Sequence, residues 1–154
     1  MATIHKISDE LFVDTFDLIA IHGNFEPYAM AYHLNKVLHL NFKRTRKDLE
    51  IGSRYFTMYT YRNDIKALDW YLISNKVTTA EKEQGTGLFE TSRMVYKMHH
   101  LIEEHKEVDF LLKLYPGDDH ESTKAIEAIR AVAKASMVYA IETDNLKSKI
   151  NLIF

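Results

Sequence analysis

An unbroken apolar run near the beginning of the chain constrains the fold more than any other feature. Within Phe16 to His22, the residues Leu18-Ile19-Ala20-Ile21 leave no polar side chain to face solvent. A run of this length predicts a strand that is buried on both faces. The loop from Gly23 to Pro27 follows, and the start of a helix is expected there, because Asn24 can cap a helix and proline is tolerated in a first turn.

The pattern after this loop predicts an amphipathic helix. The helix is expected to end at about Leu38 or Leu40, and apolar residues recur along it at spacings of three and four: Met30, Ala31, Leu34, Val37 and Leu38. The opening unit is therefore strand, short loop and helix.

The pattern changes to a period of two between Asn41 and Lys76. Aromatic and β-branched residues dominate this segment, and they alternate as Tyr55, Thr57, Tyr59, Tyr61 against Phe56, Met58, Thr60. This alternation indicates strands with aromatic pairs across the sheet, and Asn63-Asp64 indicates a turn before a returning strand at Leu68 to Ser74. The polar segment from Lys76 to Gly87 is predicted to be an exposed, mobile loop.

The segment from Phe89 to Glu107 fits either a helix or a strand. We favour a strand that ends near Ile102, a charged turn at Glu103 to Glu107, and a further strand from Val108 to Tyr115.

The last third of the chain predicts one more helix and one more strand. Ser122 is a plausible cap for a helix from Thr123 to about Ala135, and Met137 to Glu142 follows as a strand. An unanchored apolar tail is a liability, so Ile150 to Phe154 is expected to dock, either on its own domain or on a partner subunit.

These elements predict a single α+β domain over residues 1–154. A mixed, mainly antiparallel sheet would carry two helices largely on one face, with ferredoxin-like elements at both ends of the chain. The aromatic strands and the apolar tail offer more apolar surface than one small domain readily covers, which favours a homodimer.

The overall composition excludes several classes of protein. Apolar residues make up 46% of the chain and charged residues 27%, which is ordinary for a globular domain and excludes a disordered or membrane-spanning chain. The chain has no cysteine, and so it has no thiolate nucleophile or thiolate metal site. The beginning, Met1 to Ile7, lacks the apolar core of a signal peptide, and with the missing cysteine this favours the cytoplasm. No cofactor is implied.

Four segments resemble a small bacterial family known by its sequence motif as the IPExxVDY family. They are Phe16 to Ile21, Trp70 to Lys76, Val108-Asp109-Phe110 and the ending Leu146 to Phe154. Glu103, Glu104 and His105 stand where an ungapped alignment has Ile-Pro-Glu, and Phe110 replaces the tyrosine. The resemblance covers most of the chain and implies an uncharacterised cytoplasmic bacterial protein, and it transfers no catalytic residue.

A cluster of histidines and acids is the first candidate site. His99, His100, Glu103 and His105 carry imidazole and carboxylate groups, which are proper ligands for zinc or iron. The spacing is not that of the metalloprotease motif HExxH, and on a strand these residues would spread too far for one ion. A solvated polar turn is the competing interpretation.

A basic cluster is the second candidate site. Lys43, Arg44, Arg46 and Lys47 precede several aromatic residues, and basic residues interleaved with aromatics are what binding of single-stranded nucleic acid uses. The charges nearly balance, with 20 basic and 22 acidic residues, which favours instead a strand with one solvated basic face.

The loop after the first strand is the third candidate site. His22, Gly23 and Asn24 join a buried strand to a helix amino terminus, where backbone N–H groups can hold an anion. An ordinary capped turn is the competing interpretation. No residue is assigned a catalytic role, because no arrangement of nucleophile and base is present.

The sequence therefore favours a non-enzymatic binding or regulatory module that acts as a homodimer. An unidentified protein or small molecule would be its partner, and membrane binding is not expected. A metal-dependent enzyme and a nucleic-acid binder are the alternatives.

Overall fold

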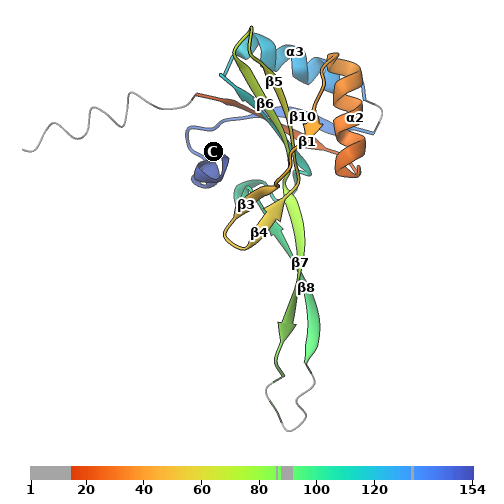
Figure 1. The fold of residues 1–154 in the computed structure, drawn as a ribbon, viewed down its shortest axis with the longest axis vertical. Helices are drawn as coiled ribbons and strands as arrows, with labels where there is room; N and C mark the ends of the chain where they lie inside the picture. The colour runs from red at the N-terminus through yellow and green to blue at the C-terminus, as the bar shows by residue number, and fades with distance from the viewer. Residues whose placement is uncertain (1–14, 86, 88–91, 133) are drawn as a thin grey trace, which may run out of the picture.

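The computed structural model describes residues 15–85, 87, 92–132 and 134–154, and the expectation for Met1 to Ile7 lies outside them. Its centre is a six-stranded sheet in which every pairing is antiparallel. The strand order is β10-β1-β9-β6-β5-β2 (Figure 1). These strands span Met137–Ile141, Asp17–His22, Phe110–Tyr115, Leu68–Ser74, Met58–Asn63 and Lys43–Arg44.

Two α-helices cover one face of this sheet. They are α2 at Pro27–Leu38 and α3 at Asp119–Arg130, and both lie on the same side of the strands in Figure 1. Met30, Leu34 and Ile129 from the helices pack in one buried cluster with alternate residues of the strands. The α+β class and the placement of two helices on one face are confirmed.

The connections follow a ferredoxin-like plan. The unit β1-α2-β6 and the unit β9-α3-β10 interleave, because β9 lies between β1 and β6 while β1 lies between β9 and β10. Each unit is thus a split β-α-β motif with a strand of the other unit inserted. β2 and β5 extend the sheet beyond β6.

Short elements cover the second face of the sheet. They are the hairpin of β3 (Leu49–Ile51) and β4 (Arg54–Phe56), and the 3-10 helices η1 (Glu103–His105) and η2 (Lys147–Leu152). Phe56, Ile102 and Leu152 join the second buried cluster with Leu18 and Leu111 of the sheet. Burial on both faces explains why β1 and β9 are almost entirely apolar.

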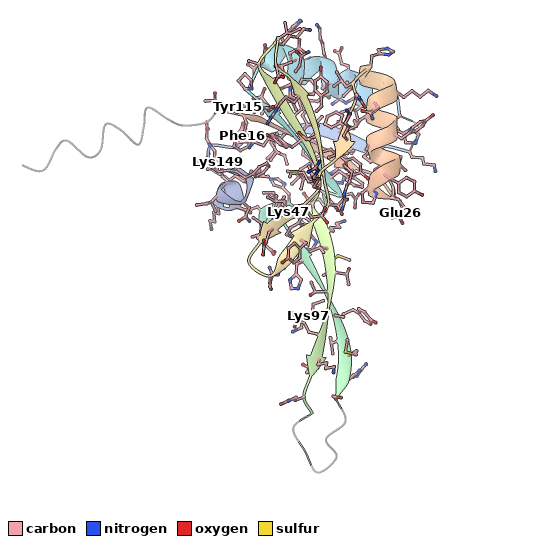
Figure 2. All side chains as sticks on the ribbon, in the orientation of Figure 1. Phe16, Glu26, Lys47, Lys97, Tyr115 and Lys149 are labelled. Carbon is pink, nitrogen blue, oxygen red and sulfur yellow. The ribbon has the colours of Figure 1, made fainter. Side chains whose placement is uncertain are left out.

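The C-terminal tail docks on its own domain. Leu152 is fully buried, and its carbonyl oxygen accepts a 2.6 Å hydrogen bond from the ammonium of Lys113, a buried residue of β9. Three aromatic rings surround this ammonium, at 4.3 Å for Phe154, 4.8 Å for Phe16 and 5.4 Å for Tyr71. Figure 2 shows Phe16 and Lys149 of η2 at the same end of the sheet. The tail therefore supplies both a buried side chain and partners for a buried charge.

The helix ends differ from those the sequence predicts. Asp118 rather than Ser122 caps α3 and accepts from the backbone N–H groups of His120 and Glu121, so this helix begins four residues earlier than Thr123 and ends at Arg130. Ser122 is instead buried and donates its hydroxyl to Asp17. Asn24 does not cap α2, which begins at Pro27 without a side-chain cap.

The prediction of a loop at Lys76 to Gly87 is wrong. Lys76–Glu83 forms β7, which pairs along its whole length with β8 at Arg93–His100. The error has a physical cause, because β7 is a polar strand that buries no side chain and therefore shows no hydrophobic periodicity. The strand, turn and strand predicted between Phe89 and Tyr115 are confirmed as β8, η1 and β9 over the described residues. In the described part of the chain, no helix is long and apolar enough to cross a membrane.

Candidate functional site

A two-stranded arm projects from the body of the domain. We call β7 and β8 together the arm, and Figure 1 shows it extending away from the six-stranded sheet. Its eight pairs run in continuous register from Lys76 opposite His100 to Glu83 opposite Arg93. A two-stranded ribbon is marginally stable by itself in water, so what its faces contact decides its role.

One face of the arm exposes large apolar side chains. Met94, Tyr96 and Met98 alternate along β8 and therefore share a face, and their exposed fractions are 47%, 73% and 59%. Thr78, Ala80 and Lys82 lie opposite them on β7. We call this surface the apolar face of the arm. Large exposed apolar surfaces with polar surroundings mark interaction sites.

The opposite face of the arm is largely polar, and polar side chains of β7 and β8 on this face contact one another. Lys97 donates a 2.8 Å hydrogen bond to Glu81, and this contact raises the pKa of Lys97 and lowers the pKa of Glu81. The hydroxyl of Thr79 lies 2.9 Å from Nε2 of His99. The polar face thus has internal partners, whereas the apolar side chains of the other face remain open to solvent.

A buried asparagine fixes the root of the arm. Asn75 lies between β6 and β7 and is fully buried. Its amide nitrogen donates to the carbonyls of His105 and Val108 at 2.8 and 2.9 Å, and its amide oxygen accepts from the N–H of Ile102 at 2.9 Å. The next residue, Lys76, forms a 2.6 Å ion pair with Asp109. The arm therefore leaves the body from a rigid base.

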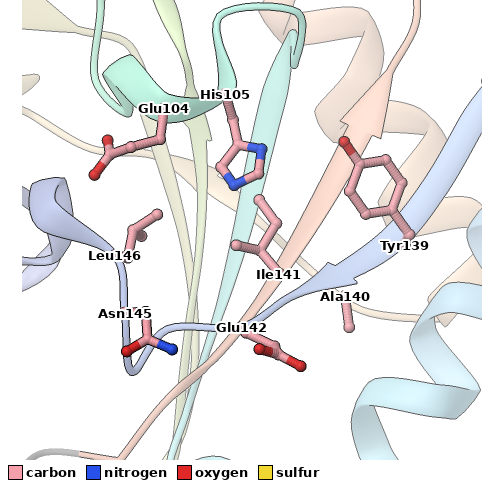
Figure 3. A pocket seen from close by; sticks show the side chains of 8 residues that line it. All are labelled: Glu104, His105, Tyr139, Ala140, Ile141, Glu142, Asn145 and Leu146. Carbon is pink, nitrogen blue, oxygen red and sulfur yellow. The ribbon is translucent and has the colours of Figure 1, made fainter.

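A cleft of about 310 Å³ lies beside this base, between η1 and β10. Figure 3 shows the side chains that line it: Glu104, His105, Tyr139, Ala140, Ile141, Glu142, Asn145 and Leu146. Its volume is at the low end for small-molecule sites. Polar side chains line both sides of it, together with the apolar Ala140, Ile141 and Leu146.

Hydrogen-bonding groups gather at the edge of the cleft. Nε2 of His22 lies 3.1 Å from the hydroxyl of Tyr139, and Nδ1 of His105 lies 3.4 Å from Glu107. Burial and then the charge of Glu107 raise the pKa of Tyr139, so the hydroxyl stays protonated at neutral pH. A hydrogen bond from its own backbone N–H, together with His105, lowers the pKa of Glu107. The edge therefore offers a neutral donor beside a carboxylate.

Glu104 joins the cleft to the C-terminal segment. Its carboxylate accepts from the N–H of Ser148 at 2.8 Å and from the hydroxyl of Ser148 at 2.5 Å. Burial opposes ionisation, but the hydrogen bonds from Ser148 prevail and lower the pKa of Glu104.

Glu104→Gln is expected to lower the melting temperature slightly at pH 7 and to have no effect in acid. A carboxyl whose pKa falls on folding stabilises the folded state above its unfolded pKa, and this contribution disappears as pH falls through the folded pKa. Thermal unfolding of wild type and variant from pH 7 to pH 3 measures the difference. Glu103→Gln is the matched control, because Glu103 forms a 3.4 Å ion pair with the exposed Lys106 at the surface. A difference in melting temperature between wild type and Glu104→Gln that persists in acid would contradict the expectation.

The three residues of the site predicted in the loop after β1 have different surroundings and do not form one site. His22 reaches Tyr139 at the edge of the cleft. The N–H of Gly23 donates instead to Asp109 at 2.8 Å, so a carboxylate of the chain itself occupies the position expected for an anion. A Cβ at Gly23 would lie 2.4 Å from the ring of Phe25, so glycine is needed there for packing. Asn24 is exposed.

The predicted metal ligands do not converge. His99 and His100 are neighbours on β8 and point to opposite faces, and Glu103 pairs with Lys106 while His105 pairs with Glu107. Burial lowers the pKa of His100. Among the residues that the structure describes, no three His, Cys, Asp or Glu side chains are grouped as a metal site requires.

The predicted basic cluster lies at the edge of the large sheet. Lys43 and Arg44 form β2, and Arg46 and Lys47 lie in the turn after it, all with exposed side chains. Arg44 pairs with Asp48 at 2.5 Å. Of the nearby aromatics that base stacking would need, Phe56 is buried and Tyr59 and Tyr61 pack against the helical core. Tyr55 is exposed, and its hydroxyl donates to Glu50, so a single exposed ring takes the place of the row of rings that successive bases would stack on.

Comparison with known proteins gives no relative for this chain: no family model, no curated protein and no solved structure matches it. Function is therefore proposed from the arm and the residues at its base. The partners that sequence reasoning missed are Tyr139 and Asp109, which meet His22 and Gly23 across 117 and 86 residues of chain.

Proposed function

We propose that this protein is a non-enzymatic binding module that works as a homodimer, and that the apolar face of the arm is its dimer contact. The observation that carries the proposal is the row of Met94, Tyr96 and Met98, each about half exposed or more on one face of a projecting ribbon. A large aromatic at the centre of such a row is the residue type that most often dominates binding energy at interfaces.

The geometry of the arm supports an interface between two copies. An arm that extends from the body reaches a second molecule without requiring the two bodies to fit together. A homodimer contact is isologous, so the same patch serves on both subunits and each apolar side chain is used twice. The polar face of the arm stays in water, where the ion pair of Lys97 with Glu81 is already formed.

We also propose, on the sequence resemblance, that the chain belongs to the IPExxVDY family and acts in the bacterial cytoplasm. Support for this location comes from the absence of cysteine in all 154 residues.

Tyr96→Asp is expected to convert the dimer to a monomer. The substitution places a charge in each half of the contact, and loss of one central aromatic costs about 2 kcal/mol or more per copy. Light scattering coupled to size exclusion should give twice the 18.0 kDa chain mass for the wild type and the single mass for the variant.

The matched control for this experiment is Ile65→Asp. Ile65 is 98% exposed and lies in the turn between β5 and β6, on the body of the domain. The substitution Ile65→Asp makes the same change from an exposed apolar side chain to an acid, and it is expected to leave the dimer intact. A wild type that stays monomeric at all concentrations, or equal dissociation by both variants, would overturn the proposal.

A further inference from the structure

The outer edge of β8 has unpaired backbone groups. Within the described residues, β8 pairs with β7 and with no other strand, so the N–H and C=O groups that every second residue of β8 directs outward have no strand partner. The root of β7 lies instead beside β4. An unprotected strand edge is a template for pairing with another chain, and here the same strand carries Met94, Tyr96 and Met98.

We infer that, within the homodimer proposed above, β8 pairs antiparallel with β8 of a second copy. The two arms then form one four-stranded sheet in the order β7-β8-β8-β7, with the two-fold axis perpendicular to it. Backbone hydrogen bonds along the edge supply the pairing, and the apolar side chains of both copies meet on one face.

The two-fold axis restricts the register of this pairing. Residues directly opposite each other point to the same face, and neighbours on a strand point to opposite faces. A perpendicular two-fold axis keeps the same face of both copies on the same side. The axis must therefore lie midway between two copies of the same residue that face each other across the strand pair. It cannot lie where two neighbouring positions, such as 96 and 97, would face each other.

The charges of β8 select Tyr96 as that residue. An axis at Lys97 would place two lysines opposite each other, and an axis at Val95 would place Arg93 opposite Lys97. Like charges directly opposite destabilise a strand pair. An axis at Tyr96 avoids both conflicts, and it pairs more of the strand than an axis nearer either end.

This register also brings the apolar side chains together. Tyr96 lies opposite Tyr96 of the other copy, and Met94 of each copy lies opposite Met98 of the other. On the polar face, Val95 faces Lys97 and Arg93 faces His99. All three exposed apolar residues of each arm are thereby used in one continuous patch, and aromatic pairs stabilise strands when they lie opposite each other.

Cysteine cross-linking tests this register directly, because the chain has no cysteine of its own. Met94→Cys and Met98→Cys are made separately, and each retains an apolar side chain of moderate size. After mild oxidation, covalent dimer is measured on a gel without reductant. The equimolar mixture of the two variants is expected to give at least about tenfold more covalent dimer than either variant alone.

The distances explain this expectation. In the mixture, opposite residues lie about 4.5–5.5 Å apart between Cα atoms, within the range that a disulfide bridges. In either variant alone, the two introduced thiols stand at the same sequence position in both copies. They are then offset by four residues along the strand, which is roughly 13 Å and too long for a disulfide.

Ala80→Cys is the matched control on the same face of the arm. Ala80 lies directly beside Tyr96 on β7, so in the proposed sheet its two copies are three strand spacings apart, roughly 14 Å. It should not cross-link. If the two arms instead pack with their apolar faces against each other, the two copies of Ala80 are not held apart in this way, and Ala80→Cys can cross-link.

Each outcome separates this register from the proposed dimer. Cross-linking by the mixture alone, with a dimeric wild type in light scattering, supports the register. A dimeric wild type in which Ala80→Cys or a single methionine variant cross-links as well as the mixture overturns the register and leaves the homodimer standing. A monomeric wild type overturns both, as does pairing of the β8 edge with a foreign strand only.

Discussion

Leu152→Ala is expected to lower the free energy of unfolding by about 2–5 kcal/mol, the usual range for removal of a buried leucine side chain. Leu152 is fully buried in the cluster on the second face of the sheet, together with Leu18, Leu101 and Ile102. Chemical denaturation monitored by the fluorescence of Trp70, which is buried in the sheet, measures the change.

Ile150→Ala is the matched control for this prediction. Ile150 lies two residues earlier in η2 and is 75% exposed, so its removal is expected to cost less than about 0.5 kcal/mol. Deletion of residues 150–154 should cost more than Leu152→Ala, because it also removes the carbonyl and the ring of Phe154 that contact Lys113. A loss for Leu152→Ala as small as the one expected for Ile150→Ala would show that the docked side chain of Leu152 does not stabilise the domain.

Asn75→Ala is expected to lower the free energy of unfolding by about 3–5 kcal/mol. The substitution leaves the buried C=O of Val108 and the buried N–H of Ile102 without their partner, and each such group costs about 1–3 kcal/mol. It also removes one of the two donors to the partly buried C=O of His105, which keeps the N–H of Val108. These groups belong to Ile102, His105 and Val108, which are the residues that hold η1 against the sheet. Urea denaturation gives the size of the loss, and hydrogen exchange at the N–H of Ile102 should accelerate.

Asn63→Ala is the control for the buried asparagine. Asn63 also uses both ends of its amide, toward the hydroxyl of Tyr61 and the N–H of Lys66, but it is the last residue of β5, beside the turn and only partly buried, where water replaces lost partners. Its substitution is expected to cost less than about 1 kcal/mol. A loss for Asn75→Ala no larger than this would mean that the buried amide does not fix the base of the arm.

Elements with local patterns could be predicted from the sequence. The apolar run of β1, the stripe of α2 and the alternation in β5 and β6 each follow from burial of one or two faces, and burial leaves a period in the sequence. The strand β9 and the turn before it were also predictable, because apolar residues stop at the charged segment from Glu103 to Glu107.

Elements held by pairing or by distant contacts could not be predicted in the same way. β7 has no fully buried side chain, and only Val77 at its base packs against the core, so its side chains carry no apolar period. Asn75 and Lys113 are polar residues within or beside apolar strands, and their partners lie 27 or more residues away. Asp118 and Ser122 are both residue types that cap helices, but Asp118 caps α3, whereas Ser122 lies inside the helix and donates to the distant Asp17.

The candidate site was predictable only in part for the same reason. His22 was found because it ends a buried strand, whereas Tyr139 and Asp109 come from β10 and from the segment before β9. The apolar face of the arm had a signal in the alternation of Met94, Tyr96 and Met98. The two methionines were equally consistent with a helix face, and only the pairing with β7 identifies the segment as a strand.

The pairing of β1 also determines when the domain can fold during synthesis. β1 is an early strand, yet its two neighbours are β9 and β10, and Leu18 is paired with Ile141. The hairpins β3–β4, β5–β6 and β7–β8 join neighbouring segments and can form as they leave the ribosome. The apolar run of β1 must wait until residues 110–141 have emerged, and such distant pairing slows folding. Throughout that interval, the apolar run of β1 stays unpaired, and an exposed apolar segment of this kind is prone to aggregation unless a chaperone protects it.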